Sequence, residues 1–131
     1  MKDLLCDHFQ DSVSELLATQ KSVLDILTKL QESQFRVNRA VVKAATSCGC
    51  IQIEAKKQSI PEDTSLQDLR NFMDTHIKGT LCEKCREVIE KELGSSMFYS
   101  AALCNVLGIS MYDVILKEYE TMNTLGIYNM F

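Results

Sequence analysis

Residues 80–107 read TLCEKCREVIEKELGSSMFYSAALCNVL, and this stretch decides the expected fold. Thr80 and Glu83 have the spacing of a capping box, so a helix is predicted to begin at Leu81. Apolar side chains recur at helical spacing along the stretch, and Gly108 follows as a stop signal. Small and apolar residues fill the second half of the helix, so neighbours can approach it closely. We therefore predict that it lies at the centre of a helical bundle.

The N-terminal part of the chain is predicted to be one long helix. Apolar positions alternate in steps of four and three over residues 3–34, which is typical of an amphipathic helix. The same spacing continues to Cys48, either as a second helix that starts near Phe35 or as a bent continuation of the first. The positions of this seam are Phe9, Val13, Leu16, Gln20, Val23, Leu27 and Leu30, with Gln20 as a polar interruption.

Two further helices are predicted beyond this segment. Residues 59–65 combine Pro61 with a polar cluster and are expected to be the main linker. A short helix is expected over residues 66–77, because Ser65 and Asp68 resemble a capping box. The last helix is expected from Met111 to about Thr124, with Ser110 as its cap and Gly126 at its end.

Composition restricts the class of protein. The chain has 131 residues, one Pro and five Gly, which suits a single all-α domain over residues 1–131 with four or five helices. No apolar run reaches the roughly 18 residues of a membrane helix, so no membrane is expected as a partner. The net charge of −4 gives no strong signal for nucleic-acid binding. The first residues lack the order of a signal peptide, so we expect a cytoplasmic protein.

Four of the six cysteines form two close pairs, Cys48–Cys50 and Cys82–Cys85. In a reducing compartment such pairs favour a shared metal site over disulfides, because each pair delivers two thiolates to one tetrahedron. Zinc is the expected ion, and an iron–sulfur cluster is the alternative. Reduced structural thiols and a redox disulfide are the other interpretations. The two remaining cysteines are expected to act as small buried apolar residues; they are Cys6 and Cys104.

The metal hypothesis makes a geometric demand on the first pair. On an unbroken helix Cys48 and Cys50 would point about 200° apart and could not share an ion. Gly49 is therefore expected to break the helix and let both thiols turn inward. The second pair is expected at a helix N-terminus, which favours the thiolate form.

A row of basic residues occupies the helix that precedes the first pair. Arg36, Arg39 and Lys43 lie at i, i+3 and i+7 and so share one face. Such a row is typical of a solvated face, and phosphate binding is the functional alternative.

Residues 92–110, ELGSSMFYSAALCNVLGIS, resemble the second conserved helix of the MazG-like all-α nucleoside triphosphate pyrophosphohydrolases. Residues 111–123, with Lys117 and Asn123, resemble the helix that follows in that family. The chain also resembles a group of short proteins from clostridia-like bacteria. The resemblance implies a MazG-like core of four helices, Mg²⁺-assisted cleavage of a nucleotide between its α and β phosphates, and dimers or tetramers.

The family holds Mg²⁺ with a Glu-Glu-x-x-Glu motif on one helix and a Glu-x-x-Asp motif on the next. Glu92 matches the first position of the second motif, Ser95 stands where the family has Asp, and residues 36–50 contain no acidic residue. Another carboxylate set on one helix face would have to replace them, namely Glu83, Glu87 and Glu90.

We therefore expect a non-catalytic binding or regulatory module with a structural four-Cys metal site and a nucleotide as a candidate ligand. The alternatives are a Mg²⁺-dependent pyrophosphohydrolase with rearranged carboxylates and a thiol- or metal-responsive sensor. A homo-oligomer, dimer or tetramer, is expected because the first helix presents a wide apolar face with adjacent pairs Leu16/Leu17 and Val23/Leu24.

Overall fold

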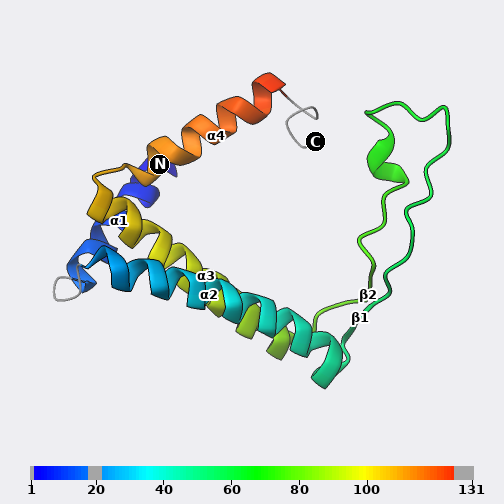
Figure 1. The fold of residues 1–131 in the computed structure, drawn as a ribbon, viewed down its shortest axis with the longest axis horizontal. Helices are drawn as coiled ribbons and strands as arrows, with labels where there is room; N and C mark the ends of the chain where they lie inside the picture. The colour runs from blue at the N-terminus through cyan, green and yellow to red at the C-terminus, as the bar shows by residue number, and fades with distance from the viewer. Residues whose placement is uncertain (1, 18–21, 126–131) are drawn as a thin grey trace.

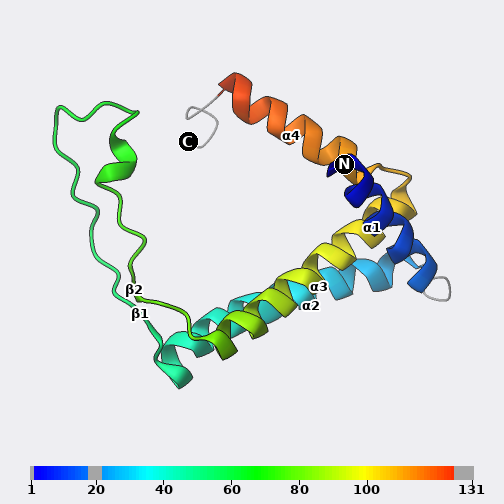
Figure 2. The same ribbon diagram turned by 180° about the vertical axis from the view of Figure 1, so that it is seen from behind.

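The computed structural model describes residues 2–17 and 22–125. Over these residues the chain forms four α-helices and two short strands, in the order α1 (Lys2–Leu16), α2 (Val23–Lys43), β1 (Ile51–Ile53), β2 (Ile77–Gly79), α3 (Glu83–Leu107) and α4 (Met111–Leu125). The helices α2 and α3 lie side by side and antiparallel along the long axis (Figures 1 and 2). The strands lie at one end of this pair, and α1 and α4 lie at the other.

The pairing of α2 with α3 is the main packing contact, and it follows from the sequence pattern. Ile26 and Ser33 are the buried residues of α2, and the buried residues of α3 are Ile89, Ser96, Ala101 and Ala102. The Ser33 hydroxyl donates to the Leu30 carbonyl at 2.7 Å, so this buried polar group is satisfied within its own helix. Because α3 packs against both α2 and α1, its predicted central position is confirmed.

A small apolar core joins α1 to the far end of this pair. Its buried members are Val13, Ile26, Ala101 and Ala102. Gly108, with φ 68°, ends α3 in the left-handed conformation, and the Ile109 N–H donates back to the Cys104 carbonyl at 2.8 Å. The chain then turns by 108° into α4, whose first turn is capped by the Ser110 hydroxyl. The predicted C-terminal end of α3 and the predicted start of α4 are thus confirmed, while Gly126 lies outside the described residues.

Between the strands, residues 54–76 form a long arm that projects from the helix pair (Figure 1). The arm is held across its width by Gln58, whose side chain accepts from the Asp74 N–H at 2.8 Å and donates to the Asp74 carbonyl at 3.0 Å. The predicted helix over residues 66–77 is wrong. Only a 3₁₀ turn, Leu69–Asn71, forms there, because the segment has no apolar surface beside it on which a helix could pack.

The predicted long N-terminal helix is also wrong. Helix α1 ends at Leu16, and Ser22 is extended (φ −67°, ψ 127°) before α2 begins. No helix boundary lies near Phe35, which is inside α2. The seam residue Gln20 lies outside the described residues. Leu16 and Leu24, expected to belong to a wide buried face, are both exposed within this chain.

The fold class is therefore mostly helical, with four helices and a small two-stranded antiparallel sheet in the described residues. No single described helix is long and apolar enough to cross a membrane, although α3 and α4 pass that test jointly as a bent pair.

Candidate metal centre

The first cysteine pair lies where α2 ends. The last residues of this helical segment, Ala44–Cys48, form a π-helical turn, a local widening that often marks functional sites. Gly49 then adopts the left-handed conformation, with φ 81° and ψ 10°, and donates its N–H to the Ala44 carbonyl at 2.9 Å. The predicted helix break at Gly49 is confirmed. Because of this break, the Cys50 thiol turns back over the helix end and lies 3.8 Å from the same carbonyl.

The short sheet brings the second pair next to the first. Strand β1 pairs antiparallel with β2, and Ile51 lies opposite Gly79. Ile51 is buried, so it anchors the strand on the helix end. Gly79 has φ 89°, and a Cβ atom there would lie 2.6 Å from the Cys50 carbonyl oxygen. A glycine is therefore required where the two segments approach, and this contact fixes the distance between the cysteine pairs.

The second pair lies at the N-terminus of α3. The helix begins at Glu83, two residues later than predicted, and Cys82 is its N-cap in extended conformation. The Cys82 sulfur accepts a hydrogen bond from the Cys85 N–H at 3.4 Å, in the position that a capping oxygen usually takes. Cys85 lies one turn further on and faces the same side.

The four sulfurs form one cluster. Cys48 Sγ and Cys82 Sγ are 3.8 Å apart, and all four Sγ atoms lie within 4.8 Å of one another. Two thiolates bound to one tetrahedral zinc at about 2.3 Å stand about 3.8 Å apart, so the spacing fits a single ion. Three of the cysteines are half-buried and Cys48 is exposed, which leaves a path for an ion to enter. The prediction that the two pairs gather at one point is confirmed.

Hydrogen bonding within the cluster separates the acidities of its thiols. The Cys85 N–H lowers the pKa of Cys82 to about 7, because it stabilises the thiolate. The hydrogen bond to Cys82 raises the pKa of Cys85 to about 12, because the Cys85 thiol is the donor and keeps its proton. One thiolate is therefore available near neutral pH as the first ligand of an incoming cation.

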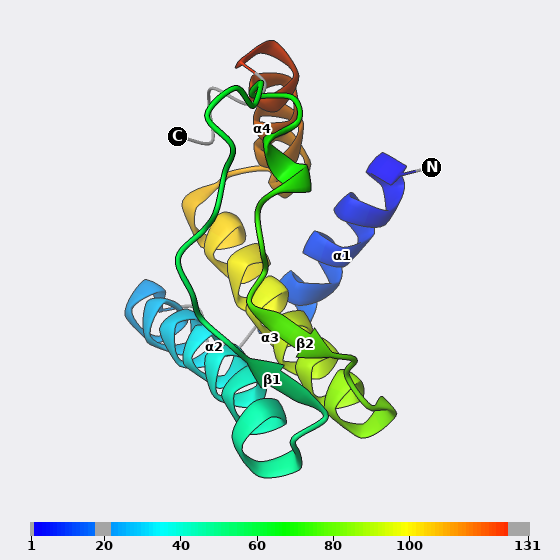
Figure 3. The ribbon, with the colours of Figure 1, turned by 90° about the vertical axis from the view of Figure 1, so that its right-hand side faces the viewer.

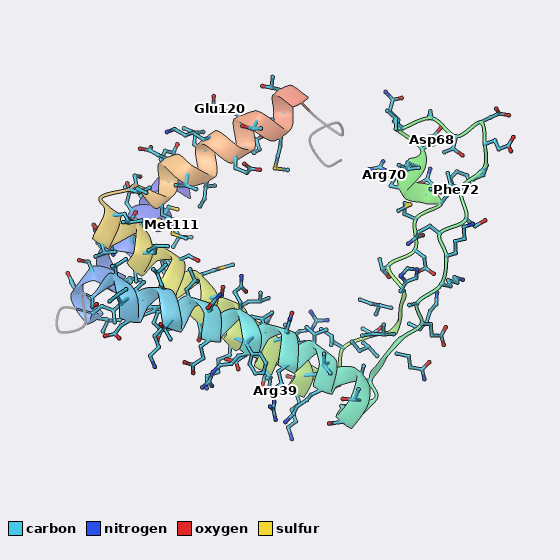
Figure 4. The ribbon with its side chains drawn as sticks, in the orientation of Figure 1. Arg39, Asp68, Arg70, Phe72, Met111 and Glu120 are labelled. Atoms are coloured by element: carbon cyan, nitrogen blue, oxygen red, sulfur yellow. The ribbon has the colours of Figure 1, made fainter. Side chains whose placement is uncertain are left out.

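The predicted basic residues meet at a groove between α2 and α3, away from the cysteines. Arg36, Arg39 and Lys43 line one cavity of about 470 Å³ together with Glu92. Arg36 and Glu92 also line a neighbouring cavity of about 400 Å³. Arg39 points away from the side on which α4 and the arm project (Figure 4). The groove thus brings together the basic row and the one acidic residue that matched the family motif.

Sequence reasoning missed the remaining polar residues of this groove, which are Lys29, Glu32, Ser33, Lys91 and Tyr99. Glu32 accepts a hydrogen bond from Arg36 at 2.8 Å, and this bond lowers the pKa of Glu32. The spacing i, i+4 of these two residues was the available signal. The Glu32 hydrogen bond and its charge, followed by the charge of Glu92, raise the pKa of Arg36, so the guanidinium lies in the field of both carboxylates.

The other candidate acids are placed differently. Glu83, Glu87 and Glu90 are all exposed on α3, and they line neither of the two cavities of this groove. In the described part of the chain, the four cysteines form the one group of three or more potential ligands that could hold a metal ion. The two remaining cysteines, Cys6 and Cys104, are half-buried.

Comparisons with protein-family models, with curated proteins and with solved structures give no match to this chain.

Proposed function

We propose that this protein is a non-catalytic, zinc-stabilised helical module that binds an anionic ligand. The observation that carries the proposal is the cluster of four sulfurs within 4.8 Å, built from a helix break, a two-stranded ribbon and a helix N-terminus. Four thiolates fill a tetrahedral zinc and leave no open position, so the metal has a structural role. The role is to join the end of α2 to the start of α3 at the base of the arm.

Zinc is favoured over an iron–sulfur cluster by the compactness of the site. In a multi-iron cluster the thiolates bind different iron atoms, which holds the sulfurs farther apart than the ligands of a single ion. All four sulfurs lie within 4.8 Å of one another, as the ligands of a single ion do.

The groove between α2 and α3 supports binding rather than catalysis. The two acidic residues among its described lining residues, Glu32 and Glu92, lie beside the Arg36 guanidinium, which supplies the positive charge that Mg²⁺ would supply in a MazG-like enzyme. Basic side chains outnumber the acids along the groove, and they are Lys29, Arg36, Arg39, Lys43 and Lys91. This balance suits a phosphate-bearing ligand such as a nucleotide, held on a MazG-like scaffold.

Metal analysis tests the zinc site. Protein purified without chelator is expected to contain one zinc per chain by mass spectrometry under native conditions. Cys82→Ser removes a ligand and is expected to release the metal and lower the melting temperature. Cys104→Ser is the matched control and is expected to keep the metal. Wild-type protein that stays metal-free after zinc is added would refute the proposal.

Treatment of the same zinc-loaded protein with peroxide distinguishes a thiol sensor from a structural metal site. A structural site keeps its zinc under mild peroxide, whereas a thiol sensor releases zinc as Cys48 or Cys82 is oxidised. The exposed Cys48 and the lowered pKa of Cys82 are the observations that favour this second function.

Binding and catalysis at the groove are tested with nucleoside triphosphates. We expect calorimetry to detect binding that weakens at least about tenfold in Arg36→Gln, since a charged partner of the phosphate is lost. Gln31→Glu, on another side of α2, is the control. Pyrophosphate release with Mg²⁺ that is abolished by Glu92→Gln would establish the enzyme in place of the binding module.

A further inference from the structure

The chain exposes far more surface than a compact protein of its mass. Its accessible surface is 10249 Å², whereas a folded monomer of this size exposes about 7,000 Å². The excess of roughly 3,000 Å² is larger than the 800 Å² per partner that a standard interface buries, and it is enough for an obligate dimer. The excess accessible area is therefore large enough for an interface with a second copy of the chain. This argument does not depend on whether the cysteines bind metal.

Part of this surface is a continuous apolar face on α4. Ile115, Leu116, Tyr119 and Met122 lie within one side of the helix, and together they define the α4 face. All four are exposed, and Tyr119 is 62% exposed. Within the described residues α4 packs mainly on α1, where Met111 joins the small core, so its outer turns have no apolar partner.

The arm also exposes four large apolar side chains, which we name the arm patch: Ile60, Leu66, Phe72 and Met73. These side chains are between 42% and 46% exposed. Surface loops are usually polar, so four large apolar side chains on a segment without a core of its own indicate a contact surface.

The positions of the two surfaces point to their partner. The arm and α4 leave the helix pair from opposite ends and project to the same side (Figures 1 and 2), and the view in Figure 3 shows that one lies behind the other. Figure 4 labels Phe72 on the arm and Glu120 on α4, and it shows that α4 slants from its own end of the helix pair towards the arm. A twofold axis that exchanges the two ends of the helix pair places α4 of one copy beside the arm of the other.

We propose that the protein is a twofold symmetric dimer in which the α4 face of each copy packs on the arm patch of the other. Each dimer then contains two equivalent contacts, as twofold symmetry requires. Each contact covers an aromatic residue from either side, Tyr119 and Phe72, which suits them as anchors of the interface.

Sedimentation velocity of the full chain tests the dimer, which is expected to form at about 20 µM, because interfaces of standard size have micromolar or tighter affinity. Tyr119→Asp and Phe72→Asp each place a charge in both contacts and are expected to weaken the dimer at least about thirtyfold. Thr124→Asp, about 140° around α4 from Tyr119, and Gln67→Asp on the arm add the same charge elsewhere and are expected to leave the dimer intact.

Mixing the two charged variants tests the exchange of partners. In a mixed dimer both charges fall in the same contact, and the other contact joins a wild-type α4 face to a wild-type arm patch. Equimolar Tyr119→Asp and Phe72→Asp are therefore expected to associate more strongly than either variant alone. Association that does not recover on mixing would refute the exchanged contact, and wild-type protein that is monomeric at this concentration would refute the dimer.

Measuring the metal content separates loss of the dimer from loss of the folded structure. The cysteine cluster lies at the end of the helix pair opposite α4, so a folded Tyr119→Asp monomer is expected to retain the metal content and helical circular dichroism of the wild type. Wild-type protein that dimerises without metal would support this inference while refuting the zinc site, so the two failures are distinguishable.

Discussion

The two ends of the α2–α3 pair are built on different principles. At the cysteine end, Ala44 and Ile51 are the buried apolar residues, and four sulfurs converge beside them. At the other end, a small apolar core centred on Val13 and Ala101 holds α1 against the pair, and the α4 face remains exposed. Metal-ligating side chains therefore converge at the cysteine end, whereas exposed apolar side chains are distributed along α4 at the other end.

The difference teaches how a chain with so small a core can still fold. Neither end buries enough apolar surface to be stable alone, and each presents what an external partner needs. In the two proposals, an ion binds the converging thiolates and a second copy binds the exposed α4 face. Partners that bind only the folded state increase its stability, so the two ends contribute independently.

Removal of metal is expected to have the largest effect, and to act on one end only. Two strands of three residues do not form a stable sheet in water by themselves. After chelation we expect hydrogen-exchange protection at β1 and Gly49 to fall by about two orders of magnitude or more, because structural zinc contributes on the order of 10 kcal/mol to folding. The amides of α1 should keep their protection. Equal loss at both ends would show that the ends are coupled.

Gly79→Ala is expected to have the next largest effect. The new methyl group would meet the Cys50 carbonyl at 2.6 Å, and φ 89° is strained for alanine. We expect a loss of at least about 2 kcal/mol in the free energy of unfolding, together with weaker zinc binding. Gly94→Ala is the control, since a Cβ there meets nothing within 4 Å. This substitution in a helix interior should stabilise the protein by up to about 1 kcal/mol. Equal zinc affinity in Gly79→Ala and wild type would contradict the geometry derived for the site.

The cysteine end was the more predictable of the two because its chemistry is local. Two close cysteine pairs and the intervening Gly49 are visible in the sequence, and the demand for a helix break follows from helix geometry alone. The ribbon was not predictable in the same way. Three-residue strands carry little propensity of their own, and the pairing of β1 with β2 depends on the close approach at Gly79, which no local pattern indicates.

The wrong helix predictions arose where a local sequence signal forms a helix only if neighbouring elements pack against it. One capping-box hydrogen bond of Ser65 and Asp68 does form, from the Asp68 N–H to Ser65 Oγ at 3.2 Å, yet only a 3₁₀ turn follows. A cap starts a helix but does not sustain one without a packed apolar face. The apolar seam continued across the break between α1 and α2 because both helices pack on α3. The spacing of Ser22 and Asp25, typical of a helix start, was the overlooked signal.

Gln10→Ala is expected to act at the α1–α4 end with a smaller effect. The Gln10 side chain donates to the Ile109 carbonyl at 2.8 Å and accepts from the Met111 N–H at 2.8 Å, so it links α1 to the turn between α3 and α4. Loss of both bonds should lower the free energy of unfolding by about 1–2 kcal/mol in urea titrations with zinc present. Zinc content should not change. Gln31→Ala, an exposed glutamine of α2, is the control, and an equal loss there would show that Gln10 has no special role.

Loss of the Asp74 charge is expected to have the smallest effect, and it acts within the arm. The His76 N–H donates to Asp74 Oδ1 at 3.0 Å, and this bond, with Lys78 and Lys56 nearby, lowers the pKa of Asp74. Because the pKa is lower in the folded arm, the carboxylate contributes stability above its ordinary pKa of about 3.9, and that contribution is lost as the pH falls through the folded value.

Carbon-detected NMR should therefore show Asp74 titrating below its ordinary pKa, with the His76 amide signal following the same curve. Asp63→Asn, elsewhere on the arm, should leave this curve unchanged. At pH 7, Asp74→Asn should loosen the His76 amide without releasing zinc. A titration at or above the ordinary pKa would remove the proposed role of this carboxylate in holding the arm together.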